Sequence, residues 1–141
     1  MAGAAGALLI APGLDGAEQV LLTLRSADVH QGGTWSIPGG AIDPGEDAHA
    51  AAVREVSEEL GIAIGDLPAT GQHVYECGGW TYTTVLLAAP TPTPLVARGW
   101  ETDDVRWFDV DEVGHLVGLH PSFGSSWPAL HQLVRERRAV S

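Results

Sequence analysis

One segment restricts the local structure more than any other: residues Asp47 to Leu60 predict an amphipathic helix. The segment is rich in alanine, and Gly61 directly after it is typical of the residue that ends a helix. Ala52, Val56 and Leu60 recur every four residues, so one face of the helix is apolar. That face must pack on another element, because an isolated helix of this length is marginal in water.

Three carboxylates lie beside the apolar face of this predicted helix. At about 100° per residue, Glu55, Glu58 and Glu59 fall within an arc of about 100°. Like charges at these spacings destabilise a helix by a few tenths of a kcal/mol per pair, and Arg54 can offset part of this by pairing with Glu58 at i+4. Taken alone, the cluster fits either a solvated acidic face or a site for Mg²⁺ or Mn²⁺, which prefer oxygen ligands.

The rest of the chain predicts mostly strands, with one further helix near the end. Ser126 is a candidate N-cap for that helix, which would run to about Arg138 with Pro128 in its first turn. Gly78 and Gly79 predict a hairpin turn. The predicted strands are Ala2 to Pro12, Gln19 to Arg25, a short strand within Gln31 to Gly40, Gln72 to Cys77, Thr81 to Ala89 and Val105 to Val110. Because strands and helices do not alternate regularly, we expect an α+β or mixed layered fold in a single domain over residues 1–141.

Composition excludes several classes of partner. The formal net charge is −11 and no basic stripe is present, which argues against a nucleic acid polymer as partner. No apolar run approaches the roughly 20 residues of a membrane-spanning helix, so we expect no membrane association. Cys77 is the single cysteine, which fits a cytoplasmic protein and an inert thiol. An acidic protein that binds a polyphosphate should need a divalent cation between the two.

From Gly40 the chain reads GAIDPGEDAHAAAVREVSEELGI, which resembles the Nudix box, G-x5-E-x7-R-E-U-x-E-E-x-G-U with U a bulky aliphatic residue. The stretch from Leu21 to Gly40 and the runs WTYTTV, DDVRWF and LHPSFGSSWPAL are similar to MutT-like members, in particular the actinobacterial 8-oxo-dGTP diphosphatase-like branch. The resemblance covers the chain from about Val20 to Leu130. The box matches at Gly40, Glu46, Arg54, Glu55, Val56, Glu58, Glu59, Gly61 and Ile62.

The resemblance implies a Nudix α/β/α sandwich with a mixed β-sheet and a loop-helix-loop box. It also implies Mg²⁺- or Mn²⁺-dependent hydrolysis of a phosphoanhydride bond in a nucleoside diphosphate derivative. The leading interpretation is conversion of a (d)NTP or oxidised dGTP to monophosphate and pyrophosphate, as in nucleotide-pool sanitation. The alternatives are hydrolysis of ADP-ribose, a sugar nucleotide or a dinucleoside polyphosphate, and a non-catalytic nucleotide sensor, which the intact box disfavours. Family members are often monomers or homodimers, and we expect one of these states.

The resemblance also suggests roles for the residues of the box. Glu55, Glu58 and Glu59 would hold the metal together with the Gly39 carbonyl. Glu55 would act as the general base, with Glu58 beside it, and Arg54 would orient the glutamates. Glu46 would contact the metal ligands without binding the metal itself, and it would help to fix the loop before the helix.

Four residues outside the helix complete the expected site. Arg25 aligns with an arginine that meets the nucleotide in MutT-type enzymes, and Gly40 would also contact substrate. A further acidic ligand often comes from a later loop or strand, for which Glu101 and Asp104 are the candidates.

The nucleoside would be recognised by residues that the box does not contain. Trp35 or Trp80 could stack on a base, although tryptophan is more often a packing residue. His30 and Gln31 precede two glycines near the expected substrate mouth. The stretch His120 to Phe123 corresponds to the guanine-reading region and lacks the asparagine of the bacterial prototype, so the preferred base stays open.

Overall fold

The computed structural model describes residues 3–13, 15–28 and 32–140, with side chains described as far as residue 136. His30 and Gln31 lie outside the described residues, so their expected position at the substrate mouth is not tested. The elements, in chain order, are β1 (Gly3–Pro12), β2 (Glu18–Arg25), β3 (Trp35–Ser36), β4 (Gly39–Ala41), α1 (Ala48–Leu60), β5 (Ala69–Cys77), β6 (Trp80–Ala88), β7 (Thr102–Asp109), a 3₁₀ turn (Val113–His115) and α2 (Pro121–Val140).

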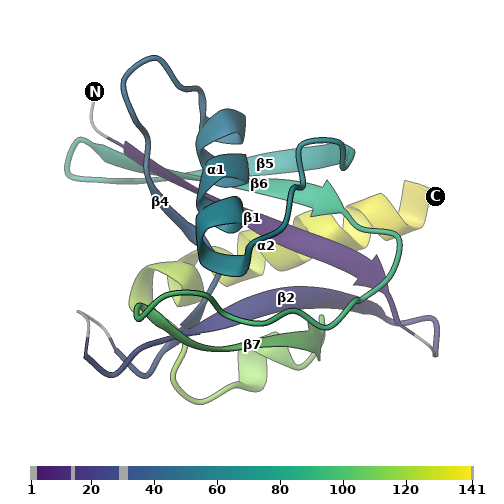
Figure 1. Cartoon of the computed structure of the whole chain (residues 1–141). Coiled ribbons are helices and arrows are strands. Elements are labelled where there is room, and N and C mark those ends of the chain that lie inside the picture. Colours follow the sequence, from purple (N-terminus) through teal and green to yellow (C-terminus); the bar gives the residue numbers. More distant parts are fainter. Residues whose placement is uncertain (1–2, 14, 29–31, 141) are drawn as a thin grey trace.

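Two helices cover opposite faces of one mixed sheet of seven strands (Figure 1). Successive residues of β1 alternate between the two faces, as expected for a strand buried on both sides. Leu8 and Ile10 belong to the apolar cluster under α2, whereas Ala7 and Leu9 belong to the cluster under α1. The three layers confirm the α/β/α sandwich that the resemblance implies.

The central strand β1 changes partner along one edge. On that edge, residues 4–6 pair antiparallel with β4, and residues 10–12 pair antiparallel with β2. On the opposite edge, β1 runs parallel to β6 over Gly3–Ile10. This arrangement brings Gly39 and Gly40 of β4 against β1, directly before the loop that leads into α1.

Helix α1 has the ends that its sequence predicts. The Oδ1 of Asp47 accepts a hydrogen bond from the Ala50 N–H at 2.7 Å, so Asp47 is the N-cap and the helix itself begins at Ala48. Gly61 takes the left-handed conformation at φ 69° and donates its N–H to the Ser57 carbonyl. The predicted apolar face is buried, and its members are Ala51, Ala52, Val56 and Leu60.

Strands β5 and β6 form the predicted hairpin. Gly78 and Gly79 both have positive φ, of 58° and 83°, which is the backbone that a two-residue type I′ turn requires. The pairing that follows from this turn places Tyr75 directly opposite Tyr82 on one face of the hairpin.

Several predicted boundaries are wrong. Helix α2 begins at Pro121 and not after Ser126, which is a buried residue inside the helix. Proline is favoured at the first helical position, and the Nδ1 of His120 accepts a hydrogen bond from the Ser122 N–H at 3.2 Å at this end. Pro128 therefore lies in the helix interior, beyond the first turn. None of the helices in the described ranges is long and apolar enough to cross a membrane.

Strands β5 and β7 also begin earlier than predicted, at Ala69 instead of Gln72 and at Thr102 instead of Val105. Acidic residues such as Asp103 and Asp104 are poor strand formers. They are nevertheless extended here, because β7 pairs antiparallel with β2 as far as Arg25, with a shift of register that leaves Asp103 unpaired between Thr102 and Asp104.

Candidate active site

The carboxylates of α1 meet the backbone of β4. Glu55 lies so close to Gly40 that a Cβ on that glycine would stand 2.5 Å from the Glu55 Oε1. Glu59, one helical turn on, accepts a hydrogen bond from the Gly39 N–H. The two glycines therefore let the sheet and the two carboxylates approach more closely than side chains would allow.

Glu59 is the most deeply buried of the predicted metal ligands. Burial first, and then the charges of Glu55 and Glu101, raise the pKa of Glu59 to about 8, while the Gly39 N–H and Arg25 oppose the shift. Its Oε2 is buried without a hydrogen-bond partner among the described residues. A buried carboxylate oxygen without a partner is costly when ionised, so this position favours either a proton or a cation.

Arg54 ties the glutamates together. Its Nη1 donates to Glu55 at 3.0 Å and to Glu58 at 3.2 Å, which confirms the predicted i+4 pair. Its Nε and Nη2 donate to the two oxygens of Glu46 at 2.9 and 3.0 Å, and Nη2 also donates to the Ala41 carbonyl. The bond to Glu46 first, then the bond to Glu58 and the charge of Asp43, raise the pKa of Arg54 well above its usual range, so the guanidinium is a fixed cation beside the cluster.

Glu46 connects the loop before α1 to the helix. Besides the bonds from Arg54, its Oε1 accepts a hydrogen bond from the Asp43 N–H at 2.9 Å. The bonds from Arg54 and then from Asp43 hold the pKa of Glu46 below its ordinary value, so this carboxylate stays ionised. Glu46 therefore joins the loop at Asp43 to Arg54 of the helix.

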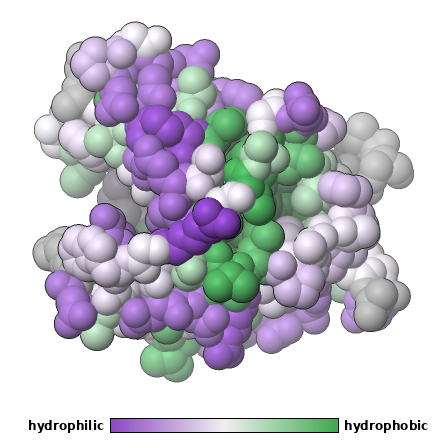
Figure 2. Space-filling model, viewed as in Figure 1, coloured by the Kyte–Doolittle hydropathy of each residue, from purple (hydrophilic) through white to green (hydrophobic). Residues whose placement is uncertain are grey.

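The remaining predicted ligands lie at different depths. The Glu58 side chain is 57% exposed, compared with 16% for Glu55, and it stays on Arg54 at the outer edge of the cluster. Hydrophilic side chains gather over α1 on the face that Figure 2 shows. Within the described part of the chain, no three acidic, histidine or cysteine side chains converge into a ready-made metal cage.

The structure distinguishes between the two candidates for a further acidic ligand. Glu101 acts electrostatically on both Glu55 and Glu59, so it lies near them. Asp104 instead bonds to Arg106, with Oδ2 at 2.7 Å from Nε, and to the N–H of Val105. Of the two, Glu101 is therefore the residue positioned beside the cluster.

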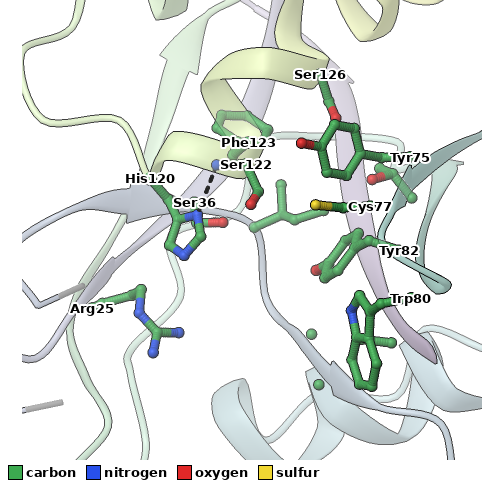
Figure 3. A pocket seen from close by; sticks show the side chains of 15 residues that line it. Arg25, Ser36, Tyr75, Cys77, Trp80, Tyr82, His120, Ser122, Phe123 and Ser126 are labelled. Atoms are coloured by element: carbon green, nitrogen blue, oxygen red, sulfur yellow. Dashed lines mark hydrogen bonds between the residues drawn. The ribbon is translucent and has the colours of Figure 1, made fainter. Parts of the chain in front are cut away.

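A cavity of about 520 Å³ opens from the same two glycines. This volume falls in the ordinary range of small-molecule sites. Its walls come from β2, β3, β5, β6 and the start of α2 (Figure 3). Arg25 supplies a positive charge, and the other side chains labelled in Figure 3 are aromatic, hydroxyl, thiol or imidazole groups: Ser36, Tyr75, Cys77, Trp80, Tyr82, His120, Ser122, Phe123 and Ser126.

The cavity separates the two tryptophan candidates. Trp80 lines it and is 43% exposed, so its ring is accessible for stacking. Trp35 packs edge-to-face on Phe108, with ring centroids 5.1 Å apart, and lies under the Arg106 guanidinium. Trp35 is accordingly a packing residue. Cys77 is exposed at the cavity wall, which differs from the buried position usual for a lone cysteine.

Sequence reasoning missed the two tyrosines of this wall. Tyr75 and Tyr82 both line the cavity and face each other across the hairpin. The signal was available, because a two-residue turn at Gly78 and Gly79 already fixes these two positions as partners.

Comparison with known proteins gives one consistent family. The NUDIX domain model matches residues 3–130. "Putative 8-oxo-dGTP diphosphatase 3" of Mycobacterium tuberculosis is 45% identical over 134 residues, which are 91% of this chain and 61% of that protein. The chain thus spans about three-fifths of the length of this relative. "Putative 8-oxo-dGTP diphosphatase 2" of the same species is 39% identical over 125 residues, 80% of this chain and 87% of that protein.

A solved structure agrees with these relatives. The crystal structure of the M. smegmatis Nudix hydrolase RenU superposes with a TM-score of 0.87 at 41% identity, covering 95% of this chain and 86% of that one. The matched region contains the whole glutamate helix, the glycine strand β4 and both walls of the cavity. On these grounds the chain belongs to the Nudix hydrolase family, in its MutT-like branch.

Proposed function

We propose that this chain hydrolyses a phosphoanhydride bond in a nucleoside diphosphate derivative, with a (d)NTP or oxidised dGTP as the first candidate substrate. The observation that carries the proposal is the junction at Gly39 and Gly40. On one side of it stand the Glu55 and Glu59 carboxylates, and on the other a cavity of about 520 Å³ with aromatic and hydroxyl walls. Such a junction can hold a nucleoside and direct its phosphates at the carboxylates.

A hard divalent cation fits the donors at this junction. The Oε2 of Glu59 is a buried oxygen that lacks a partner among the described residues, and Glu55 and Glu101 are the carboxylates that act on it. All three offer oxygen ligands, which Mg²⁺ and Mn²⁺ prefer. The Gly39 carbonyl and the more exposed Glu58 are the further donors that we assign to the cation. When bound, Mg²⁺ or Mn²⁺ neutralises phosphate charge and lowers the pKa of the attacking water.

The chain's own groups divide the remaining work. Glu55 accepts a proton from the attacking water, since it lies beside the Gly40 backbone at the cavity mouth. Arg54 holds Glu55 and Glu58 in one orientation through its Nη1. Arg25, a positively charged residue of the cavity wall, binds the phosphate chain. For a nucleoside triphosphate the products are the monophosphate and pyrophosphate, and the leaving oxygen takes a proton from solvent.

The substrate assignment draws on the relatives. Two of them bear the name 8-oxo-dGTP diphosphatase, and both align with more than three quarters of this chain. The cavity wall also suits a flat heteroaromatic base, because Trp80 offers a stacking face and three serines offer hydroxyl hydrogen bonds.

The test is a hydrolysis screen with Mg²⁺ or Mn²⁺ over 8-oxo-dGTP, the four dNTPs, ADP-ribose and a dinucleoside tetraphosphate, scored by product. We expect pyrophosphate release from a triphosphate, and a loss of orders of magnitude in Glu55→Gln with an unchanged melting temperature. Release of AMP from ADP-ribose without activity on triphosphates would reject the substrate assignment. Near-normal turnover in Glu55→Gln would remove Glu55 from the role of base.

A further inference from the structure

The Tyr82 side chain occupies the point where the cavity meets the glycine strand. Its hydroxyl oxygen fills space that two glycines leave open. A Cβ on Gly39 would lie 2.5 Å from this oxygen, and a Cβ on Gly6 would collide with it as well. Gly6 and Gly39 are register partners between β1 and β4, so the hydroxyl sits against both strands at once. The phenol is therefore held rigidly beside the backbone that also bonds Glu59.

Charged groups of both signs surround this hydroxyl. Burial, then the charges of Glu59 and Glu55, raise the pKa of Tyr82 above its ordinary value, while Arg25 lowers it. These effects show that the carboxylates of α1 and the guanidinium of the cavity wall both lie near the phenol. At neutral pH the group keeps its proton and acts as a neutral hydrogen-bond donor. Figure 3 shows the ring reaching into the cavity with its oxygen foremost.

We propose that the Tyr82 hydroxyl donates a hydrogen bond to the phosphate that adjoins the nucleoside, and so positions the substrate at the boundary between base recognition and hydrolysis. This inference rests on the proposed function. With the nucleoside in the cavity and the terminal phosphates toward Glu55 and Glu59, the first phosphate is the group that passes this boundary. A phosphate near two carboxylates needs donors that add no negative charge, and the Tyr82 hydroxyl is such a donor.

The rigidity of the phenol strengthens this assignment. Because the hydroxyl is already seated between Gly6 and Gly39, it loses little conformational freedom when a phosphate arrives. Arg25 can meet the same phosphate from the cavity wall, since its charge acts on the same phenol. Tyr82 would then orient the phosphate through a hydrogen bond, and Arg25 would balance the negative charge of the phosphate.

The chain contains a matched control in Tyr75. It is the register partner of Tyr82, it lines the same cavity and it carries the same hydroxyl. Its hydroxyl is not among the nearest atoms to Gly6 or Gly39. Tyr75→Phe therefore removes a phenolic hydroxyl from the cavity but leaves the Tyr82 hydroxyl at Gly6 and Gly39 in place.

The experiment compares Tyr82→Phe, Tyr75→Phe and the unsubstituted chain in binding and in turnover. Dissociation constants for dGMP and for deoxyguanosine are measured by intrinsic tryptophan fluorescence or by calorimetry. If the screen favours another base, its monophosphate and nucleoside replace them. We expect Tyr82→Phe to weaken monophosphate binding about 10-fold while nucleoside binding changes less than twofold. The ratio of the two constants should stay unchanged in Tyr75→Phe.

This ratio is insensitive to a partly unfolded sample, because both ligands sense the same folded fraction. In turnover we expect Tyr82→Phe to lower kcat/KM for a triphosphate at least 10-fold. Equal losses for nucleoside and monophosphate, or an unchanged ratio, would overturn the assignment of Tyr82 to the phosphate. A chain that binds dGMP in this Tyr82-dependent way yet hydrolyses no nucleotide would contradict the proposed function and leave the Tyr82 contact supported.

Discussion

Replacing Gly40 by alanine tests the closeness of Glu55 to strand β4. The added Cβ would stand 2.5 Å from Oε1, 2.6 Å from Cδ and 2.8 Å from Oε2 of Glu55. Real Cβ contacts are essentially never shorter than 3.0 Å, so the carboxylate must withdraw by about half an ångström or more. The displaced group is the far end of a flexible side chain, and the fold itself can remain as it is.

Gly40→Ala should therefore lower the turnover number and leave the stability of the fold nearly unchanged. A displacement approaching about 1 Å at a reacting group can lower the rate by about 100-fold, so we expect kcat of Gly40→Ala to fall about 10- to 100-fold. The melting temperature should change by less than about 3 °C, because no backbone atom stands among the nearest contacts of the new methyl. Steady-state kinetics on the best substrate of the screen, with thermal melts of the same samples, measure both quantities.

Gly71 offers the matched control. It lies in β5, away from the cavity lining, and a Cβ there would meet no atom within 4 Å. Gly71→Ala is thus the same chemical change without the contact, and its kcat should stay within about twofold of the original. If Gly40→Ala keeps full activity, or if Gly71→Ala loses as much, Glu55 does not depend on the missing side chain and the reasoning fails.

Three other results follow from the same contacts. Gly39→Ala should lower the free energy of unfolding by about 1–3 kcal/mol in urea titration, because its Cβ would meet the Ala5 carbonyl at 2.5 Å and the Gly6 Cα at 2.7 Å; a variant as stable as the original would contradict this. Arg54→Lys should lower kcat about 10-fold or more with KM little changed, since one ammonium cannot replace a fork that reaches Glu46, Glu55 and Glu58; full activity would exclude an orienting role. Without metal, the folded chain keeps a proton on Glu59 up to a pKa of about 8, whereas an unfolded glutamate releases it near 4.5. The free energy of unfolding of the metal-free protein should therefore fall between about pH 5 and pH 8, by at most about 1.4 kcal/mol per pH unit, and a slope as steep in Glu59→Gln would refute this origin.

Local sequence sufficed for the elements whose ends are coded nearby. Asp47 and Gly61 mark helix α1, and the glycine pair at 78 and 79 marks the β5–β6 hairpin. Strand β4 has no such local code, because Gly39 and Gly40 are poor strand residues that become extended by pairing with β1. The first turn of α2 was missed for a similar reason. His120 and Pro121 are typical of a loop, and the sequence does not show that the His120 imidazole accepts a hydrogen bond from the Ser122 N–H.

The candidate site also has features that local sequence predicts and features that depend on tertiary contacts. Helical spacing predicts the Arg54–Glu58 pair and the common face of the three glutamates. It does not predict which of them is buried. Glu59 turns inward because β4 offers it the Gly39 N–H, a contact between segments far apart in the chain. The position of Glu101 near Glu55 and Glu59 is also tertiary, whereas the bond from Arg106 to Asp104 is local, because the two residues are two apart in β7.

The position of β1 in the sheet has a consequence for the order of assembly. Its first residues pair with β4 on one edge and with β6 on the other, and the register partners in β1 and β6, such as Gly3 and Thr81, are more than half of the chain length apart. Folding is slow when the entropy of closing so long a loop is lost before the non-local contacts form. On the ribosome, β1 must therefore wait until Tyr82 has been synthesised before Gly6 and Gly39 can close around its hydroxyl. The glutamate helix and its partners β1 and β4 are made earlier, but the cavity side of the junction needs β6, so the site should mature only after β6 has emerged.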